Sequence, residues 1–96
     1  MLFDKPLKSG ETVTIKLTTG EELIARFDEE QDGNIVANKP VVLAPGAGRR
    51  IGMVPWIMSA EPDKVRINKE NILTYTTTQK EIADKYIEMT SSITLV

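Results

Sequence analysis

The chain has 96 residues, a length that suits one domain with a hydrophobic core of its own. It contains no cysteine and no histidine, which excludes disulfides, zinc sites built on thiolates and most familiar catalytic constellations. With 14 acidic and 12 basic residues the net charge is −2, so any nucleic-acid site has to be a local patch.

Two alternating segments joined at one glycine follow a short lead-in. From Val13 to Leu17 every second residue is apolar, the period of a strand with one buried face. Gly20 supplies the turn because it accepts the positive φ of a tight hairpin, and the apolar row resumes from Leu23 to Phe27. The pattern predicts a hairpin at the start of a small, strongly bent β-barrel.

The middle of the chain predicts two longer strands. Asp32-Gly33 favours a turn, and a third strand runs from Asn34 to Ala44. Pro40 interrupts it, and because proline cannot donate to a strand ladder we expect a bulge, a sharp bend or an edge position there. The fourth strand begins with the segment 51–58, breaks near Pro62 and resumes at Val65. Its first part is apolar on both alternating faces, so we expect a second subunit to bury one of them.

A short strand and a helix complete the predicted elements. The polar turn 68–71 precedes the last strand, Ile72 to Thr76. Thr78-Gln-Lys-Glu81 has the form of a capping box, which predicts a helix over about residues 79–90. One stripe of this helix carries four apolar or aromatic residues, namely Ile82, Tyr86, Met89 and Ile93.

Five strands in this order, without crossover helices, predict an all-β fold. We expect a single domain, residues 1–96, in which a highly curved antiparallel sheet closes on itself. The barrel would occupy about residues 12–77 and the C-terminal helix about 79–90.

The chain resembles the Sm/Lsm family, whose barrel is of the SH3-like kind. The family's first motif matches from Val13 to about Leu43 and its second from Val65 to Tyr75. The best markers are Gly20, Asn34-Ile35-Val36, and Ile67-Asn-Lys-Glu-Asn-Ile72 in place of the family's isoleucine–arginine–glycine–x–x–valine. The small, bent motifs also resemble those of small Sm-like proteins carried by bacterial viruses (bacteriophages).

The resemblance implies a homo-oligomeric ring. In this family the fourth strand of one subunit pairs with the fifth strand of the next, which gives a ring of about five to seven copies and covers the exposed strand edges. The Met and Trp residues of segment 51–58 could alternatively form a surface on which bases stack. A strand that is apolar on both faces favours packing in the core or the subunit interface instead. The predicted interface residues are Met53, Val54, Trp56, Met58, Ile72, Leu73 and Tyr75.

The resemblance also implies a site for single-stranded RNA around the central pore. Family members stack each base on a side chain before the third strand, hold it with an asparagine and complete the pocket with an arginine. Asn34 matches the asparagine, Asp32 stands at the stacking position, and Asn68 and Lys69 replace the arginine and the glycine after it. Asp32 has no ring and Lys69 lacks the planar fork of arginine, so we expect weak binding.

Each of these residues also has an ordinary structural interpretation. Asn34 and Asn68-Lys69 are typical of turns, since asparagine readily bonds local backbone. Arg49-Arg50 could contact phosphates or simply keep a loop soluble. The acidic run 28–30 could hold calcium or magnesium, although a solvated turn is favoured.

Three function classes follow from the sequence. The first is a ring that binds single-stranded RNA, and the alternative is a scaffold or adaptor ring that has lost the RNA pocket. The third, an enzyme, is not expected, because the sequence shows no nucleophile–base pair, phosphate-cradling loop or metal-ligand cluster. We therefore expect no cofactor and no metal. With no apolar run of about 18 residues and no typical signal peptide, the expected location is cytoplasmic, away from membranes.

Overall fold

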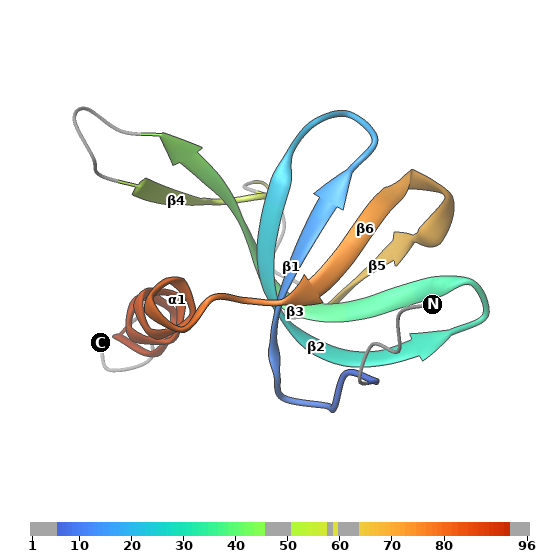
Figure 1. Ribbon diagram of the computed structural model, residues 1–96, viewed down its shortest axis with the longest axis horizontal. Helices are drawn as coiled ribbons and strands as arrows, with labels where there is room; N and C mark the ends of the chain where they lie inside the picture. The colour runs from blue at the N-terminus through green and yellow to red at the C-terminus, as the bar shows by residue number, and fades with distance from the viewer. Residues whose placement is uncertain (1–5, 46–50, 58, 60–63, 93–96) are drawn as a thin grey trace.

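The computed structural model describes residues 6–45, 51–57, 59 and 64–92 (Figure 1). The first two strands are β1 (Thr12–Leu17) and β2 (Glu22–Gln31). The remaining elements in the described residues are β3 (Asn34–Pro45), β4 (Ile51–Pro55), β5 (Lys64–Asn68), the 3-10 helix η1 (Lys69–Asn71), β6 (Ile72–Thr77) and α1 (Lys80–Ser92).

The strands form one antiparallel sheet in the order β4-β3-β2-β1-β6, with β5 also paired to β3. Strand β3 changes partner along its length, because Asn34–Asn38 pairs with β5 and Val41–Pro45 pairs with β4. This confirms the mostly antiparallel β-fold with a C-terminal helix.

Two details of the predicted fold are wrong. The sheet has six strands rather than five, because the expected fourth strand is two strands, β4 and β5, that pair with different halves of the bent β3. The sheet also does not close on itself. Between β5 and β6, the turn of η1 replaces the tight turn that a hairpin needs, and in the described residues β6 pairs with β1 alone.

The bend in β3 confirms the disruption expected at Pro40. The register with β2 shifts between Asn38 and Val41, which leaves Lys39 and Pro40 in a bulge. Lys39 has a φ of 46°, in the left-handed region, and Pro40 has no amide to contribute to the ladder. Beyond this bulge, β4 and the end of β3 extend as an arm away from the other strands (Figure 1).

The interior of the bent sheet holds the main hydrophobic core. The inward rows of β1 and β2 are buried as their alternation predicts, and Leu7 from the lead-in segment packs against them. The buried members of this core are Val13, Ile15, Leu17, Leu23, Ala25, Phe27, Ile35, Ala37 and Ile67.

Helix α1 covers a second, smaller core on the other side of the sheet. Tyr86 is 1% exposed and packs with Ile24 and Val41. Its hydroxyl group donates to the carbonyl oxygens of Asn38 and Lys39, at 3.0 and 2.8 Å. Because these carbonyls flank the start of the β3 bulge, Tyr86 attaches the helix to the bend.

The helix stripe predicted from the sequence is the packing face, since Ile82 and Met89 join Tyr86 there; Ile93 lies outside the described residues. The expected capping role of Thr78 is wrong. The helix begins at Lys80, and the Thr78 hydroxyl pairs with that of Thr14 in β1 at 2.9 Å, a tertiary partner that replaces the local one. No helix in the described ranges is long and apolar enough to cross a membrane.

Candidate nucleic-acid interface

A two-residue turn forms the tip of the β2–β3 hairpin. Gln31 and Asn34 are paired, and the residues between them, Asp32 and Gly33, have φ values of 49° and 79°. Positive φ at both central residues is the mark of a type I′ turn, for which Asp-Gly is a favoured sequence. The side chain of Asp32 is therefore exposed at the tip, and Asn34 is the first residue of β3.

The predicted RNA-binding residues meet at this tip. Asn34 is the register partner of Asn68, the last residue of β5. The amide of Lys69 donates to the carbonyl oxygen of Gly33 at 3.0 Å. The fold thus brings Asp32, Asn34, Asn68 and Lys69 together from two separate segments, while their role in binding stays a prediction.

Local bonds occupy some of these side chains. The side-chain oxygen of Asn68 accepts from the amide of Glu70 at 2.9 Å and so caps η1, which is the ordinary turn role considered for it. By contrast, the side chains of Asp32 and Asn34 form no hydrogen bond or ion pair with other described residues. Asn34 keeps its amide available for a ligand.

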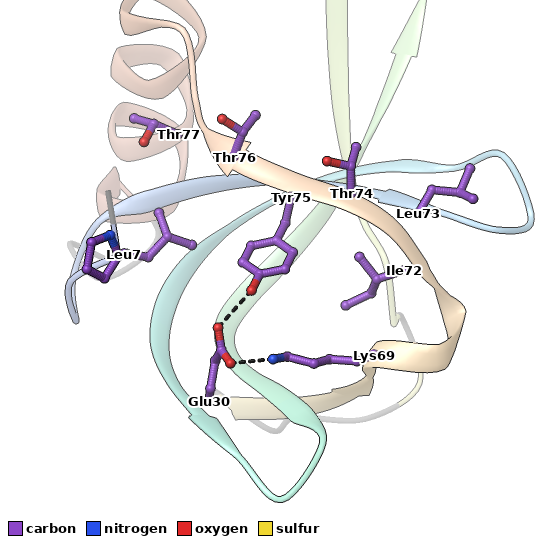
Figure 2. A pocket seen from close by; sticks show the side chains of 10 residues that line it. Leu7, Glu30, Lys69, Ile72, Leu73, Thr74, Tyr75, Thr76 and Thr77 are labelled. Atoms are coloured by element: carbon purple, nitrogen blue, oxygen red, sulfur yellow. Dashed lines mark hydrogen bonds and ion pairs between the residues drawn. The ribbon is translucent and has the colours of Figure 1, made fainter. Parts of the chain in front are cut away.

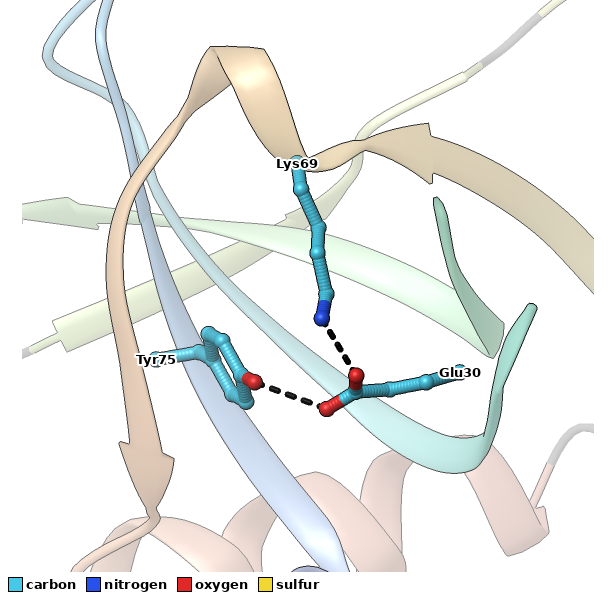
Figure 3. A network of polar contacts seen from close by, with 3 residues as sticks. All are labelled: Glu30, Lys69 and Tyr75. Atoms are coloured by element: carbon cyan, nitrogen blue, oxygen red, sulfur yellow. Dashed lines mark hydrogen bonds and ion pairs between the residues drawn. The ribbon is translucent and has the colours of Figure 1, made fainter. Parts of the chain in front are cut away.

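Lys69 belongs to a polar network with Glu30 and Tyr75 (Figure 3). Its ammonium group forms an ion pair with one carboxylate oxygen of Glu30, and the Tyr75 hydroxyl donates to the other oxygen at 2.7 Å. The Lys69 and Glu30 side chains are 39% and 45% exposed, so the pair remains accessible from solvent.

The charges in this network stabilise one another. The hydrogen bond from Lys69, followed by the one from Tyr75, lowers the pKa of the Glu30 carboxyl. The bond to Glu30 raises the pKa of both Lys69 and Tyr75. At neutral pH, Glu30 is therefore a carboxylate and Lys69 an ammonium, and the single cation of the predicted pocket is balanced by an acid.

Glu30 is the residue that the predicted pocket missed. Counting outward from the two-residue turn, Glu30 pairs with Ile35, whose side chain is fully buried in the core. Cross-strand partners share a face of the sheet, so Glu30 lies on the inward face beneath the tip, as Ile35 does. The Asp-Gly turn makes this pairing countable from the sequence, because it fixes a two-residue turn. Within the acidic run considered for calcium, Asp28 pairs with Lys64 at 3.1 Å while Glu30 pairs with Lys69. No group of three or more metal-ligating side chains occurs among the described residues.

A groove of about 650 Å³ runs along β6 beside this network (Figure 2). Glu30 enters it from β2, and Lys69 and Tyr75 point toward Glu30 from η1 and β6. Pro6 and Leu7 of the lead-in segment line another part of the wall, and the residues of β6 from Ile72 to Thr77 complete it. The groove thus connects the hairpin tip with the edge of the sheet.

A family model for the Sm_like domain matches residues 14–87, which include most of β1, all of β2 to β6 and most of α1. This chain belongs to the Sm-like family. No curated protein sequence matches it significantly. The family match confirms the resemblance seen in the two motifs and does not distinguish the bacterial-virus type. It also supports a fold that is typically oligomeric and associated with RNA.

The predicted interface residues of this Sm-like protein divide into two groups. Val54 in β4 and Leu73 in β6 are 43% and 65% exposed. Leu73 lies where the β1–β6 register shifts, so it is the extra residue of a bulge. The others are partly buried within their own subunit, namely Met53, Trp56, Ile72 and Tyr75, and Met58 lies outside the described residues. Arg49-Arg50 also lies outside them.

Proposed function

We propose that this Sm-like protein assembles into a homo-oligomeric ring that binds single-stranded RNA weakly around its central pore. The observation that carries the proposal is the meeting of the Asp32-Gly33 turn and Asn34 with Asn68 and Lys69 at one end of the sheet. These are the positions at which the family resemblance implies a base pocket.

The two ends of the sheet support the ring. Strand β4 ends the sheet order on one side and β6 on the other, and each of these strands presents an exposed apolar residue, Val54 and Leu73. An unpaired edge is a site at which another chain can add a strand. Pairing of β4 in one subunit with β6 in the next would be head-to-tail, and such a contact closes into a ring when the rotation per subunit allows it.

Two side chains supply the proposed RNA chemistry. Asn34 offers an amide that can bond a base edge, and Lys69 offers a cation for a phosphate or a base oxygen. Repetition around a ring strengthens contacts that are individually weak. Low affinity is expected because Asp32 provides no stacking ring and Glu30 offsets the charge of Lys69.

The second candidate function is a scaffold or adaptor ring without RNA. The Glu30–Lys69 ion pair and the capping role of Asn68 favour it, because both occupy groups that an RNA pocket would use. In either function the proposed role is non-catalytic and needs no cofactor. The cytoplasm remains the proposed location.

Titration of fluorescently labelled oligo-uridine and oligo-adenine strands at low salt separates the two functions. The proposal predicts saturable binding that weakens as salt is added, since cations on the protein displace counterions from the strand. Absence of binding by a protein that is assembled as a ring would favour the scaffold.

A further inference from the structure

The Glu30–Lys69 pair presents an ordered set of hydrogen-bonding groups to the groove. The ammonium of Lys69 only donates, and the ionised carboxylate of Glu30 only accepts. A carboxylate has about four acceptor sites, and the bonds from Lys69 and Tyr75 occupy one site on each oxygen. Each oxygen therefore keeps one further acceptor site, beside the site that Lys69 or Tyr75 occupies.

This donor–acceptor–acceptor order is complementary to one nucleobase edge. The Watson–Crick edge of guanine presents the O6 acceptor, then the N1–H donor, then the N2 amino donor. Lys69 can donate to O6 while the two oxygens of Glu30 accept from N1–H and from the amino group. The pair therefore offers the same order of groups as the cytosine with which guanine normally pairs.

The other bases fit this pair less well. Uracil presents two acceptors on either side of one donor, so an acceptor of the base would face an oxygen of Glu30. Adenine and cytosine each supply one amino donor next to one acceptor. Each can therefore form two hydrogen bonds with the Glu30–Lys69 pair, whereas guanine forms three. An unpaired or opposed polar group costs binding free energy, so these differences become differences in affinity.

We infer that Glu30 and Lys69 make the RNA site prefer guanine. The inference rests on the proposed RNA binding and adds the base that the site selects. The groove of about 650 Å³ beside the pair has room for a purine ring, and Leu7 and Ile72 contribute apolar side chains to its wall. Both charged side chains are accessible from solvent, so a base can reach them without unfolding the hairpin tip.

The test uses short labelled oligo-uridine strands that carry one central guanosine, inosine, adenosine or uridine. Inosine is the sharpest probe, because it keeps O6 and N1–H and lacks only the 2-amino group. At neutral pH and low salt, the guanosine strand should bind about five- to tenfold more tightly than the uridine strand. The inosine strand should lie between them.

Two variants assign the preference to the pair. In Glu30→Gln the guanosine strand should lose its advantage over uridine, because the amide offers only one acceptor oxygen. The matched control is Glu29→Gln, which removes the same charge from the neighbouring exposed position, and it should keep the advantage.

Each outcome bears on a separate statement. Equal binding of the guanosine, inosine and uridine strands by the unaltered protein would overturn the guanine preference and leave RNA binding intact. A preference that survives in Glu30→Gln would overturn the role of Glu30. Failure of every strand to bind would overturn the proposed function together with the preference. The comparison of guanosine with inosine needs no variant, so it holds even if Glu30→Gln does not fold.

Discussion

Lys69 and Glu30 lie 39 residues apart in the sequence and form an ion pair beneath the tip of the β2–β3 hairpin. The pair joins two parts of the Sm-like surface, because Lys69 lies beside the RNA-binding positions and Tyr75, the third member of the network, lies on the edge strand β6. A change at Glu30 or Lys69 therefore alters the charge of the proposed RNA site.

Lys69→Ala should weaken the binding of oligo-uridine. The substitution removes one cation per subunit and leaves the Glu30 carboxylate uncompensated near the phosphates. A plot of log affinity against log salt concentration should become shallower, by about 0.7 for each subunit that the strand contacts. The matched control is Lys85→Ala on the exposed face of α1, which should leave both quantities unchanged. Identical binding by the two variants would move the RNA site elsewhere.

Val54→Asp should dissociate the ring. An aspartate in the proposed contact would be buried without a partner, which strongly opposes association. Ile87→Asp on α1 is the control, since Ile87 and Val54 have nearly equal exposure, 42% and 43%. Light scattering coupled to size-exclusion chromatography should report a subunit mass for Val54→Asp and the ring mass for Ile87→Asp. A ring that persists in Val54→Asp would place the interface away from β4.

A charge at Met53 is a poorer test of the same contact. Met53 packs against the small core of Ile24, Val41 and Tyr86 within its own subunit. An aspartate there would disturb the seating of α1 before any effect on assembly could be measured.

Tyr86→Phe should lower the stability of the fold by about 1 kcal/mol, the usual value of one hydrogen bond. The variant removes the hydroxyl that bonds the carbonyls of Asn38 and Lys39 and keeps the ring in its cavity. Urea unfolding at neutral pH measures the difference. An unchanged midpoint would mean that these bonds do not hold the helix to the β3 bend.

The same residue predicts a loss of stability at alkaline pH. Burial raises the pKa of Tyr86 to about 12, whereas an unfolded chain releases this proton near pH 10. Because the pKa is raised in the folded state, this residue stabilises the folded protein fully below about pH 10. The contribution is lost as the pH rises toward 12. Relative to Tyr86→Phe, the free energy of unfolding should fall by about 1.4 kcal/mol per pH unit in that window. Parallel pH profiles for the two proteins would contradict this assignment.

Gly20→Ala should destabilise the first hairpin by about 1–2 kcal/mol. Gly20 has a φ of 101°, and an added Cβ would meet nothing within 4 Å, so the cost is backbone strain alone. Gly52→Ala is the control, because Gly52 lacks a positive φ and its added Cβ would lie 3.6 Å from the Ala44 carbonyl oxygen, an ordinary contact. Thermal unfolding should separate the two variants, and equal melting temperatures would remove the argument for a glycine in this turn.

Local patterns predict the first hairpin and the helix face because both follow from side-chain periodicity. Val13, Ile15 and Leu17 alternate in the sequence and are buried in the structure. Ile24 carries a less obvious signal. It is an apolar residue at an outward position of β2, and it predicts that something must cover that face, which α1 does.

Other features depend on tertiary partners that a local pattern does not contain. The sequence around Thr78 has every element of a capping box, yet its hydroxyl bonds Thr14, 64 residues earlier. The open sheet follows from the turn of η1 and from the change of partner at the β3 bend, which together keep β5 apart from β6. Motif position predicts Asp32, Asn34, Asn68 and Lys69 as site residues, a role that stays a prediction, whereas placing Glu30 beside Lys69 requires knowledge of the turn type and of the register.

Native mass spectrometry of the purified protein, alone and with short oligo-uridine and oligo-adenine strands, tests the proposed RNA-binding ring because it reports assembly and RNA stoichiometry together. We expect a closed ring of about five to seven subunits that takes up one strand. A monomer in the absence and presence of RNA would contradict the ring, and a ring that stays bare with every strand would contradict RNA binding.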